Sequence, residues 1–353
     1  MLRSESLRFL TRDYRDQPGL EPTPDSQLSL DAVLENALHN PSLGICTRYV
    51  ALAVNKIRAP ITAMAWLPEG RRLLTGSHTG EFTLWNGAQF NFEGIVQQAH
   101  DEPVRSMVWS HGGSVMLSAD EGGVVKYWQS SLNNLKAFKA HKEPIRDLSF
   151  SPSDVHFVSA SDDQSCSIWD TETSTEVTAL KGHGWDVKAA KWHPSKGLII
   201  TGGKDQLIKL WDPRSNAGTV AGQKDKHCLA DIHAHKNTVN RLAWCPSNPH
   251  WFLSGSRDNL VKVFDLRTMK EIQTHRAHKK EITALTWHPS IERLFASGSY
   301  DGTIFKWCEN THTHTHADTR SVSHRIPVAA GSCRMTTARD RVIVFVCCGR
   351  ARR

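Results

Sequence analysis

The stretch AHKEPIRDLSFSPSDVHFVSASDDQSCSIWD, residues 140–170, decides the fold of this chain. It contains three short runs of alternating apolar and polar residues, IRDLSF (145–150), HFVSAS (156–161) and CSIWD (166–170), separated by Ser-Pro and Asp-Asp turns. Period-two patterning between tight turns is typical of antiparallel strands. We therefore expect the stretch to fold as a meander of three strands followed by a polar connection.

The same pattern recurs six times between about residue 60 and residue 307. Each copy ends on an aromatic residue, and successive copies are 43, 41, 42, 53 and 43 residues apart: Trp85, Trp128, Trp169, Trp211, Phe264 and Trp307. A second aromatic stands 19 or 20 residues before each of these: Trp66, Trp109, Phe150, Trp192, Trp244 and Trp287. Burial between stacked sheets accounts for ten of the twelve tryptophans, since a period near 40 residues indicates a repeat architecture.

Polar residues recur at fixed positions in the repeats as well. A Ser or Thr stands ten residues before the terminal aromatic, and four repeats have an Asp six residues before it and a His 22 or 23 residues before that Asp. The four pairs are His141 with Asp163, His183 with Asp205, His235 with Asp258, and His278 with Asp301. A buried imidazole, carboxylate and hydroxyl are tolerated only when they satisfy one another, so these residues are interpreted as structural rather than catalytic.

Two repeats depart from this pattern. The first has Ile57 and Thr79 at the His and Asp positions, and the second has His100 but Gly122. We expect packing alone to hold these two units.

These spacings resemble the WD40 family, whose repeats form the four-stranded blades of a β-propeller. The resemblance implies an all-β propeller with six clear repeats, an incomplete or degenerate seventh blade, and a mostly irregular N-terminal segment and tail. The predicted divisions are an N-terminal extension and linker (1–46), the propeller (47–307) and an atypical low-complexity basic tail (308–353). TRYVALAV, 47–54, is expected to be a lone strand that completes the last blade.

The tail contains no seventh copy of the repeat. Its Thr-His run is interpreted as low-complexity sequence rather than a metal site, and our hypothesis is that read-through of non-coding sequence has replaced the final repeat. Six repeats can finish the ring in two ways: either TRYVALAV pairs with the sheet that ends at Trp307 and closes a six-bladed ring, or the blades keep a seven-fold spacing and leave a gap. We favour the second, because the side chains of each sheet set how neighbouring blades pack. The tail would then fill the remaining gap poorly.

Composition limits the possible functions. The net charge is +7, but the tail alone has eight Arg against three acidic residues, so overall basicity is weak evidence for a nucleic-acid partner. The eight cysteines are scattered without a CxxC pair, which indicates a reducing compartment and no metal site. No signal peptide, membrane span, nucleophile elbow or phosphate loop is recognisable, so neither an enzyme nor a cofactor nor a membrane is expected.

Several longer segments of the sequence resemble one particular group of WD40 proteins. NKIRAPITAMAWLPEG (55–70), GEFTLWNG (80–87) with FNFE (90–93), and GHGWDVKAAKWHPSKGLIITGGKDQLIKLWDP (182–213) are similar to the WD40 subunit of the cleavage and polyadenylation specificity factor. The resemblance covers roughly residues 8–307. It implies a non-enzymatic nuclear scaffold that recognises the AAUAAA-type signal of pre-mRNA together with a zinc-finger subunit and other subunits of that machinery.

The resemblance also implies RNA-binding residues. It assigns a stacking role to Phe92, an apolar contact to its neighbour Ile95, and a lysine contact to Lys56; aromatic faces stack on unpaired bases and lysines neutralise phosphates. Periodicity alone instead favours Phe92 as a packing residue in a connection between blades. RFLTRDYRD (8–16) matches only the trailing part of the family's basic segment, and Val54 stands where the family has a small polar contact residue.

One alternative function and two surface predictions remain. Trp211-Asp212-Pro213-Arg214 fits the WDxR pattern by which substrate receptors of cullin-type ubiquitin ligases bind their adaptor, although Phe264-Asp265-Leu266-Arg267 shows the same spacing without the Trp. Four lysines that follow the repeat His are expected on one rim of the ring: Lys142, Lys236, Lys279 and Lys280. Trp185, which the core pattern does not explain, is expected to be partly exposed on that rim as a partner contact.

Overall fold

A computed structural model describes residues 59–87, 89–214, 227–289 and 294–308, and the backbone of strands 324–327, 333–338 and 341–346. The chain divides into two compact units, Met1–Ile45 and Cys46–Arg353, and the described residues all belong to the second. Every regular element in the described part is a β-strand. No helix there is long and apolar enough to cross a membrane.

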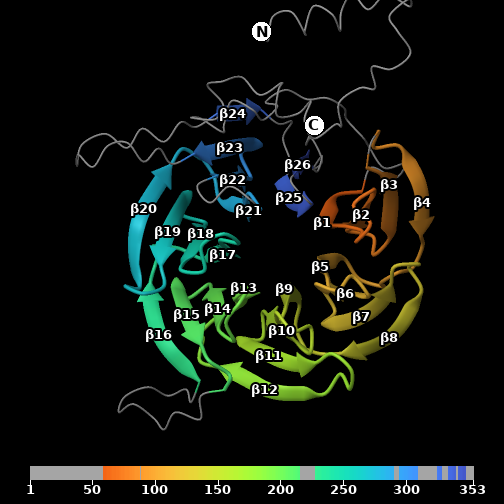
Figure 1. Cartoon of the computed structure of the whole chain (residues 1–353), viewed down its shortest axis with the longest axis horizontal. Coiled ribbons are helices and arrows are strands. Elements are labelled where there is room, and N and C mark those ends of the chain that lie inside the picture. The colour runs from red at the N-terminus through yellow and green to blue at the C-terminus, as the bar shows by residue number, and fades with distance from the viewer. Residues whose placement is uncertain are drawn as a thin grey trace, which may run out of the picture. The chain divides into compact units, whose positions relative to one another are not determined.

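Six four-stranded antiparallel sheets, the blades, follow one another around a centre (Figure 1). From the innermost strand outward, blade 1 comprises β1 (Ile61–Trp66), β2 (Arg72–Ser77), β3 (Phe82–Asn86) and β4 (Phe92–Val96); blade 2 comprises β5 (Val104–Trp109), β6 (Val115–Asp120), β7 (Val124–Gln129) and β8 (Asn134–Lys139); and blade 3 comprises β9 (Ile145–Phe150), β10 (His156–Ser161), β11 (Ser165–Asp170) and β12 (Glu176–Lys181).

The second half of the ring repeats this order. Blade 4 comprises β13 (Val187–Trp192), β14 (Ile199–Gly203), β15 (Leu207–Trp211) and β16 (Cys228–His233); blade 5 comprises β17 (Val239–Trp244), β18 (Trp251–Ser256), β19 (Leu260–Asp265) and β20 (Lys270–Arg276); and blade 6 comprises β21 (Ile282–Trp287), β22 (Leu294–Ser299), β23 (Thr303–Cys308) and β24 (His324–Pro327). The predicted six repeats are confirmed, each as one blade.

The core lies between neighbouring blades, because alternation along each strand gives both faces of a sheet apolar residues. Leu117 and Tyr127 of blade 2 pack with Leu148 and Phe157 of blade 3, and all four are almost completely buried. Each such large side chain contributes about 2 kcal/mol. The ring is therefore held by a series of similar interfaces rather than by one central core.

The repeated tryptophans are buried as expected, with one exception. Nine of the ten are at most 9 % exposed, and Trp109 is partly buried. Four tryptophans at the ends of innermost strands also line a central cavity of about 320 Å³: Trp109, Trp192, Trp244 and Trp287. These aromatics therefore face the centre of the ring as well as the neighbouring blades.

Two β-bulges recur in the blades. In the innermost strand the second residue has no partner in the ladder, as at Arg105, which lies between the paired Val104 and Ser106. In the outermost strand of blade 1, Phe92 pairs with Trp85 and Gly94 with Leu84, so Glu93 is bulged. A bulge places two residues opposite one and redirects the side chains beyond it.

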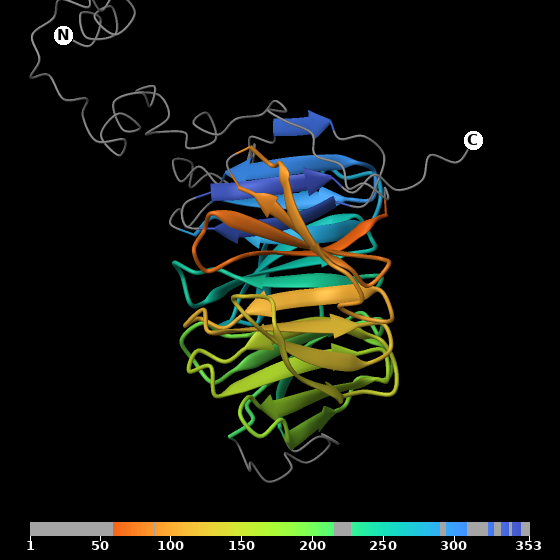
Figure 2. The same ribbon diagram turned by 90° about the vertical axis from the view of Figure 1, so that its right-hand side faces the viewer.

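One end of every blade has the same backbone bond. The amide that follows the second strand donates to the carbonyl that precedes the first strand, at 2.8 to 3.0 Å: His78 to Pro60, Glu121 to Pro103, Asp162 to Pro144, Lys204 to Asp186, Arg257 to Thr238, and Tyr300 to Glu281. In the side view the strands run between the two ends of the ring (Figure 2). We call the end that carries these six bonds the entry rim.

Among the described residues, the sector between blades 6 and 1 contains two strands, β25 (Cys333–Ala338) and β26 (Arg341–Val346), which pair with each other. Innermost strands of consecutive blades contact one another from β1 to β21, and β25 contacts both β21 and β1 (Figure 1). The six blades and this hairpin therefore follow one another around the centre, and the seven-fold spacing stays a prediction. In blade 6, β24 takes the outermost place that the sequence analysis gave to residues 47–54, which lie outside the described residues.

This sector yields a stability prediction. Ending the chain after Cys308 removes the four paired residues of β24 and also β25, which contacts both β1 and β21, and exposed strand edges favour association. At about 1 kcal/mol per lost hydrogen bond, we expect a loss of roughly 3 kcal/mol and a melting midpoint lower by roughly 6 to 12 °C. A chain in which a copy of blade 3 replaces residues 309–353 should melt above both. Equal midpoints, with equal monomer content by size exclusion, would show that six blades are sufficient.

Candidate functional site

The predicted His and Asp pairs of blades 3, 4 and 5 are all hydrogen-bonded. The His Nδ1 atom lies 2.7 Å from the carboxylate of Asp163 in blade 3, 2.7 Å from that of Asp205 in blade 4 and 2.9 Å from that of Asp258 in blade 5. The Nε2 atoms lie 2.6 Å from the hydroxyls of Ser159, Thr201 and Ser254. In blades 3 and 4 the indole N–H of the terminal Trp donates to the same hydroxyl, whereas blade 5 has Phe264 there.

These networks keep their carboxylates ionised. Burial raises the pKa of Asp163, but hydrogen bonds from His141 and Ser165 outweigh it and lower that pKa to about 2. The pKa values of Asp205 and Asp258 are lowered in the same way, against burial, by His183 and His235. In each of these networks both ring nitrogens of the His have a partner, which fits a structural role.

Blade 2 corrects one expectation. It is not held by packing alone, because His100 Nδ1 lies 2.8 Å from Oδ2 of Asp120, and His100 Nε2 lies 2.5 Å from the hydroxyl of Ser118. Trp128 donates to that hydroxyl at 2.8 Å. The carboxylate comes from the position two residues before Gly122, so the same network is built from a different place in the sequence.

Blades 1 and 6 show looser versions. In blade 1 Thr79 bonds Ser77 at 2.7 Å and Trp85 donates to Thr75 at 2.9 Å. In blade 6 the imidazole of His278 is 2.7 Å from Ser297 but 3.8 Å from the carboxylate of Asp301. Burial lowers the pKa of His278 to about 4 against the opposing effect of Asp301.

The outer face of blade 1 carries two of the predicted RNA-binding residues. Phe92 is 54 % exposed and Ile95 is 41 % exposed, although three residues apart on a regular strand would place them on opposite faces. The bulge at Glu93 brings them to the same face, since they pair with Trp85 and Thr83. Phe92 meets Trp85 edge to face at 6.4 Å between ring centroids, and Glu93 bonds Arg72 at 3.0 Å.

Blades 2 to 5 have no such apolar pair at these positions. The residues paired like Phe92 are Asn134, Glu176, Cys228 and Glu271, and those paired like Ile95 are Ala137, Ala179, Asp231 and Thr274. Phe92 is thus a supported but solvent-facing ring on an outermost strand, not a packing residue in a connection between blades. Lys56 lies outside the described residues.

The WDxR sequence forms a local turn. Asp212 accepts a hydrogen bond from the backbone of Arg214 at 3.0 Å, and its side chain lies 3.5 Å from the guanidinium. Asp265 and Arg267 form the same turn in blade 5, with the guanidinium bonded at 3.0 Å. The repeated turn explains the repeated spacing without a ligase adaptor.

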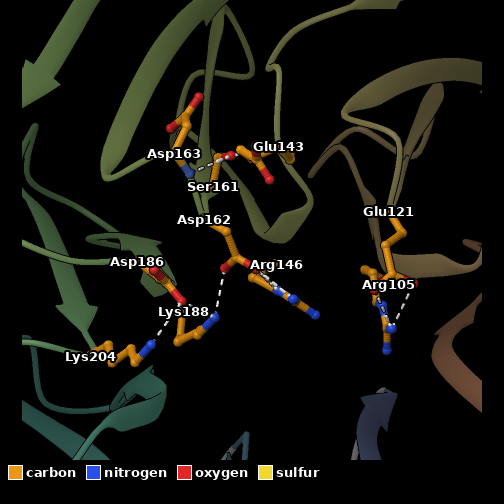
Figure 3. A network of polar contacts seen from close by, with 10 residues as sticks. All are labelled: Arg105, Glu121, Glu143, Arg146, Ser161, Asp162, Asp163, Asp186, Lys188 and Lys204. Carbon is orange, nitrogen blue, oxygen red and sulfur yellow. Dashed lines mark hydrogen bonds and ion pairs between the residues drawn. The ribbon is translucent and has the colours of Figure 1, made fainter.

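The entry rim carries the remaining predicted surface residues. Lys142, Lys236, Lys279 and Lys280 are all exposed in loops that lead into innermost strands, and Trp185 is 57 % exposed. The exposure expected of the four lysines and of Trp185 is therefore confirmed, and a partner contact at Trp185 stays a prediction. The rim also contains a network that sequence reasoning missed (Figure 3): Asp162 bonds Arg146 of its own blade and Lys188 of the next at 2.7 Å each, and Asp186 bonds Lys188 at 3.0 Å.

The fold and these networks define a WD40 β-propeller. The family model described as "WD domain, G-beta repeat" matches residues 54–86, 93–129, 132–170, 174–212, 226–265 and 269–308, so the chain belongs to this family. Among the described residues no group of three or more His, Cys, Asp or Glu side chains is placed to hold a metal ion.

Three fungal relatives narrow the comparison, and all are named polyadenylation factor subunit 2. The protein of Candida albicans is 47 % identical over 231 residues, 65 % of this chain and 40 % of the relative. The protein of Aspergillus fumigatus is 49 % identical over 203 residues, which are 57 % of this chain and 34 % of the relative. The protein of Cryptococcus neoformans is 41 % identical over 177 residues, which are 50 % of this chain and 24 % of the relative. The matched region spans less than half the length of these relatives.

Proposed function

We propose that this chain is a non-catalytic subunit of the nuclear machinery that cleaves and polyadenylates pre-mRNA. The names of its fungal relatives support the process, and a propeller whose recurrent His and Asp side chains are all engaged supports a scaffold. In this proposal the partners are other subunits of the machinery, including a zinc-finger subunit. Together they recognise an AAUAAA-type signal.

We further propose that the outer face of blade 1 contacts the RNA. The single observation that carries this proposal is the exposure of Phe92 and Ile95 on one face, where blades 2 to 5 have polar or small residues. Trp85 supports the Phe92 ring from below by an edge-to-face contact, which leaves a flat apolar face toward solvent. An unpaired base can stack on such a ring, and Ile95 would limit the space beside it.

The test is RNA binding by the chain assembled with its zinc-finger partner. Stacking on one aromatic side chain is worth about 1 to 3 kcal/mol, so Phe92→Ala should weaken binding of an AAUAAA oligonucleotide by about 5- to 150-fold. Leu135→Ala is the matched control, because Leu135 is a 53 % exposed apolar residue on the outermost strand of blade 2. Fluorescence anisotropy would report both. Equal losses for the two variants, or no loss for Phe92→Ala, would contradict the proposed contact.

A further inference from the structure

The entry rim changes in charge around the ring. On blades 4 to 6 it presents a surface that we call the basic arc: Trp185, Lys204, Lys236, Arg257, Lys280 and Tyr300. The side chains of Lys204 and Arg257 are 48 % and 64 % exposed, and Lys236 and Lys280 are exposed as well. On blades 2 and 3 the exposed acidic residues of the same rim are Asp101, Glu102 and Glu143.

Two exposed aromatic side chains stand within the basic arc. Trp185 in blade 4 is 57 % exposed and Tyr300 in blade 6 is 52 % exposed. Each has a lysine over its ring: Lys204 Nζ lies 5.1 Å from the Trp185 centroid, and Lys280 Nζ lies 5.4 Å from that of Tyr300. Such cation–π contacts fix the orientation of a ring while leaving its other face and edge free. Exposed, oriented tryptophans are typical anchors of protein interfaces.

The positive charge of the arc is only partly balanced within the chain. Lys204 lies 3.8 Å from Asp186, which already bonds Lys188 at 3.0 Å (Figure 3). Arg257 lies 3.4 Å from Glu281. Within the described residues, Lys236 and Lys280 have no carboxylate within 4 Å. These two lysines remain available to an external acid.

The distribution of charge favours a protein over RNA as the occupant. The acidic residues on blades 2 and 3 would repel a long polyanion that followed the rim. A protein segment whose acidic residues meet only the basic arc is complementary to this surface.

We propose that the basic arc is a docking surface for an acidic protein segment anchored on Trp185. The arc belongs to blades 4 to 6, whereas Phe92 belongs to the outermost strand of blade 1, so this surface is separate from the proposed RNA contact. Trp185 contributes apolar area to the complex. The lysines and Arg257 select carboxylates and accelerate association.

Gly184 allows a direct test that leaves Trp185 intact. A Cβ atom placed at Gly184 would meet nothing within 4 Å, and the same holds for Gly94, next to the proposed RNA contact. The photo-crosslinking amino acid p-benzoylphenylalanine is placed at one or the other position of the full chain in cells, and the crosslinked material is identified by mass spectrometry. At position 184 we expect a protein segment rich in Asp and Glu, and at position 94 we expect RNA.

Charge reversal supplies the control. Lys204→Glu combined with Lys236→Glu should lower the crosslink yield at position 184 by roughly tenfold. Lys142→Glu is the control, because Lys142 lies on the same rim but among the acidic residues. It should leave the crosslink yield nearly unchanged, since exposed charges farther apart than about 8 Å are screened. RNA at position 184, a segment without acidic excess, no crosslink, or insensitivity to the charge reversal would each overturn the docking surface. Failure at position 94 alone would overturn only the RNA contact.

Discussion

Replacing Asp120 with serine is expected to lower the free energy of unfolding by about 3 kcal/mol, because the carboxylate is the acceptor for two buried donors. It lies 2.8 Å from His100 Nδ1 and 2.8 Å from the amide of Val124, and its side chain is only 4 % exposed. Without it, the imidazole loses its partner inside blade 2. Thermal and urea unfolding would measure the loss, which should shift the melting midpoint down by roughly 6 to 12 °C.

A second substitution makes this prediction specific. Blade 3 has Ser161 and Asp163 where blade 2 has Asp120 and Gly122, so Asp120→Ser with Gly122→Asp converts blade 2 to the arrangement of blade 3. A Cβ atom at Gly122 meets its nearest neighbour at 3.4 Å, which is ordinary contact. We expect the double variant to recover most of the lost stability. A double variant no more stable than Asp120→Ser would mean that His100 does not depend on a carboxylate.

Acid is expected to destabilise the interface between blades 5 and 6 through two histidines. Burial lowers the pKa of both His275 and His278 from 6.5 to about 4. His275 packs against Phe295 and Trp307, with ring centroids 5.2 Å and 4.5 Å away, and His278 lies against Phe305 at 4.8 Å. Both rings are therefore neutral in the folded chain over most of the range in which the unfolded chain binds protons.

The sign follows from proton binding. Between pH 6.5 and about 4 the unfolded state binds up to two more protons than the folded state, so stability falls as pH falls, by about 1.4 kcal/mol per pH unit for each histidine and about 3 kcal/mol for each over the whole window. The carboxylates affect stability at lower pH: Asp163, with its pKa lowered to about 2, loses its contribution to the stability of the folded state between about pH 4 and pH 2. The two effects are separable by pH.

Urea unfolding between pH 7 and pH 4 would measure the histidine effect. His275→Phe keeps a ring against Trp307 and should remove about half of the slope. His233→Gln is the control, because His233 is exposed on the outermost strand of blade 4. The same slope in His275→Phe as in the unmodified chain would contradict the assignment to this histidine.

The spacing of aromatics and hydroxyls was sufficient to predict the blades, because each repeat must bury the same residues between the same neighbours. It was not sufficient to predict the acid in blade 2. A fixed distance of six residues before Trp128 leads to Gly122, whereas the structure needs only a carboxylate within reach of His100. A signal was present in the sequence: His100 kept its place although Gly122 stands at the acid position, and two acids, Asp120 and Glu121, directly precede that glycine.

The blade 1 site shows a different limit. The RNA-binding role proposed for Phe92 rests on the family resemblance, because the period-two pattern alone also fits a packing residue. Its common face with Ile95 depends on the bulge at Glu93, which a period-two pattern does not reveal. Similarly, the rim network around Asp162 joins residues of two blades, and pairing within one repeat cannot predict a contact between repeats.

The bulge of the innermost strands separates the residues that pair in the ladder from the residues that can serve another purpose at the entry rim. The bulged residues, which take no place in the ladder, are Thr62, Arg105, Arg146, Lys188, Asn240 and Thr283. In every blade the residue before the bulge is Ile or Val, whereas the residue after it is Ala or Ser in four blades, Asp147 in blade 3 and Arg241 in blade 5. These six positions can thus change in chemistry without removing a pair from the ladder. They are the first positions to edit when a new specificity is grafted onto this scaffold.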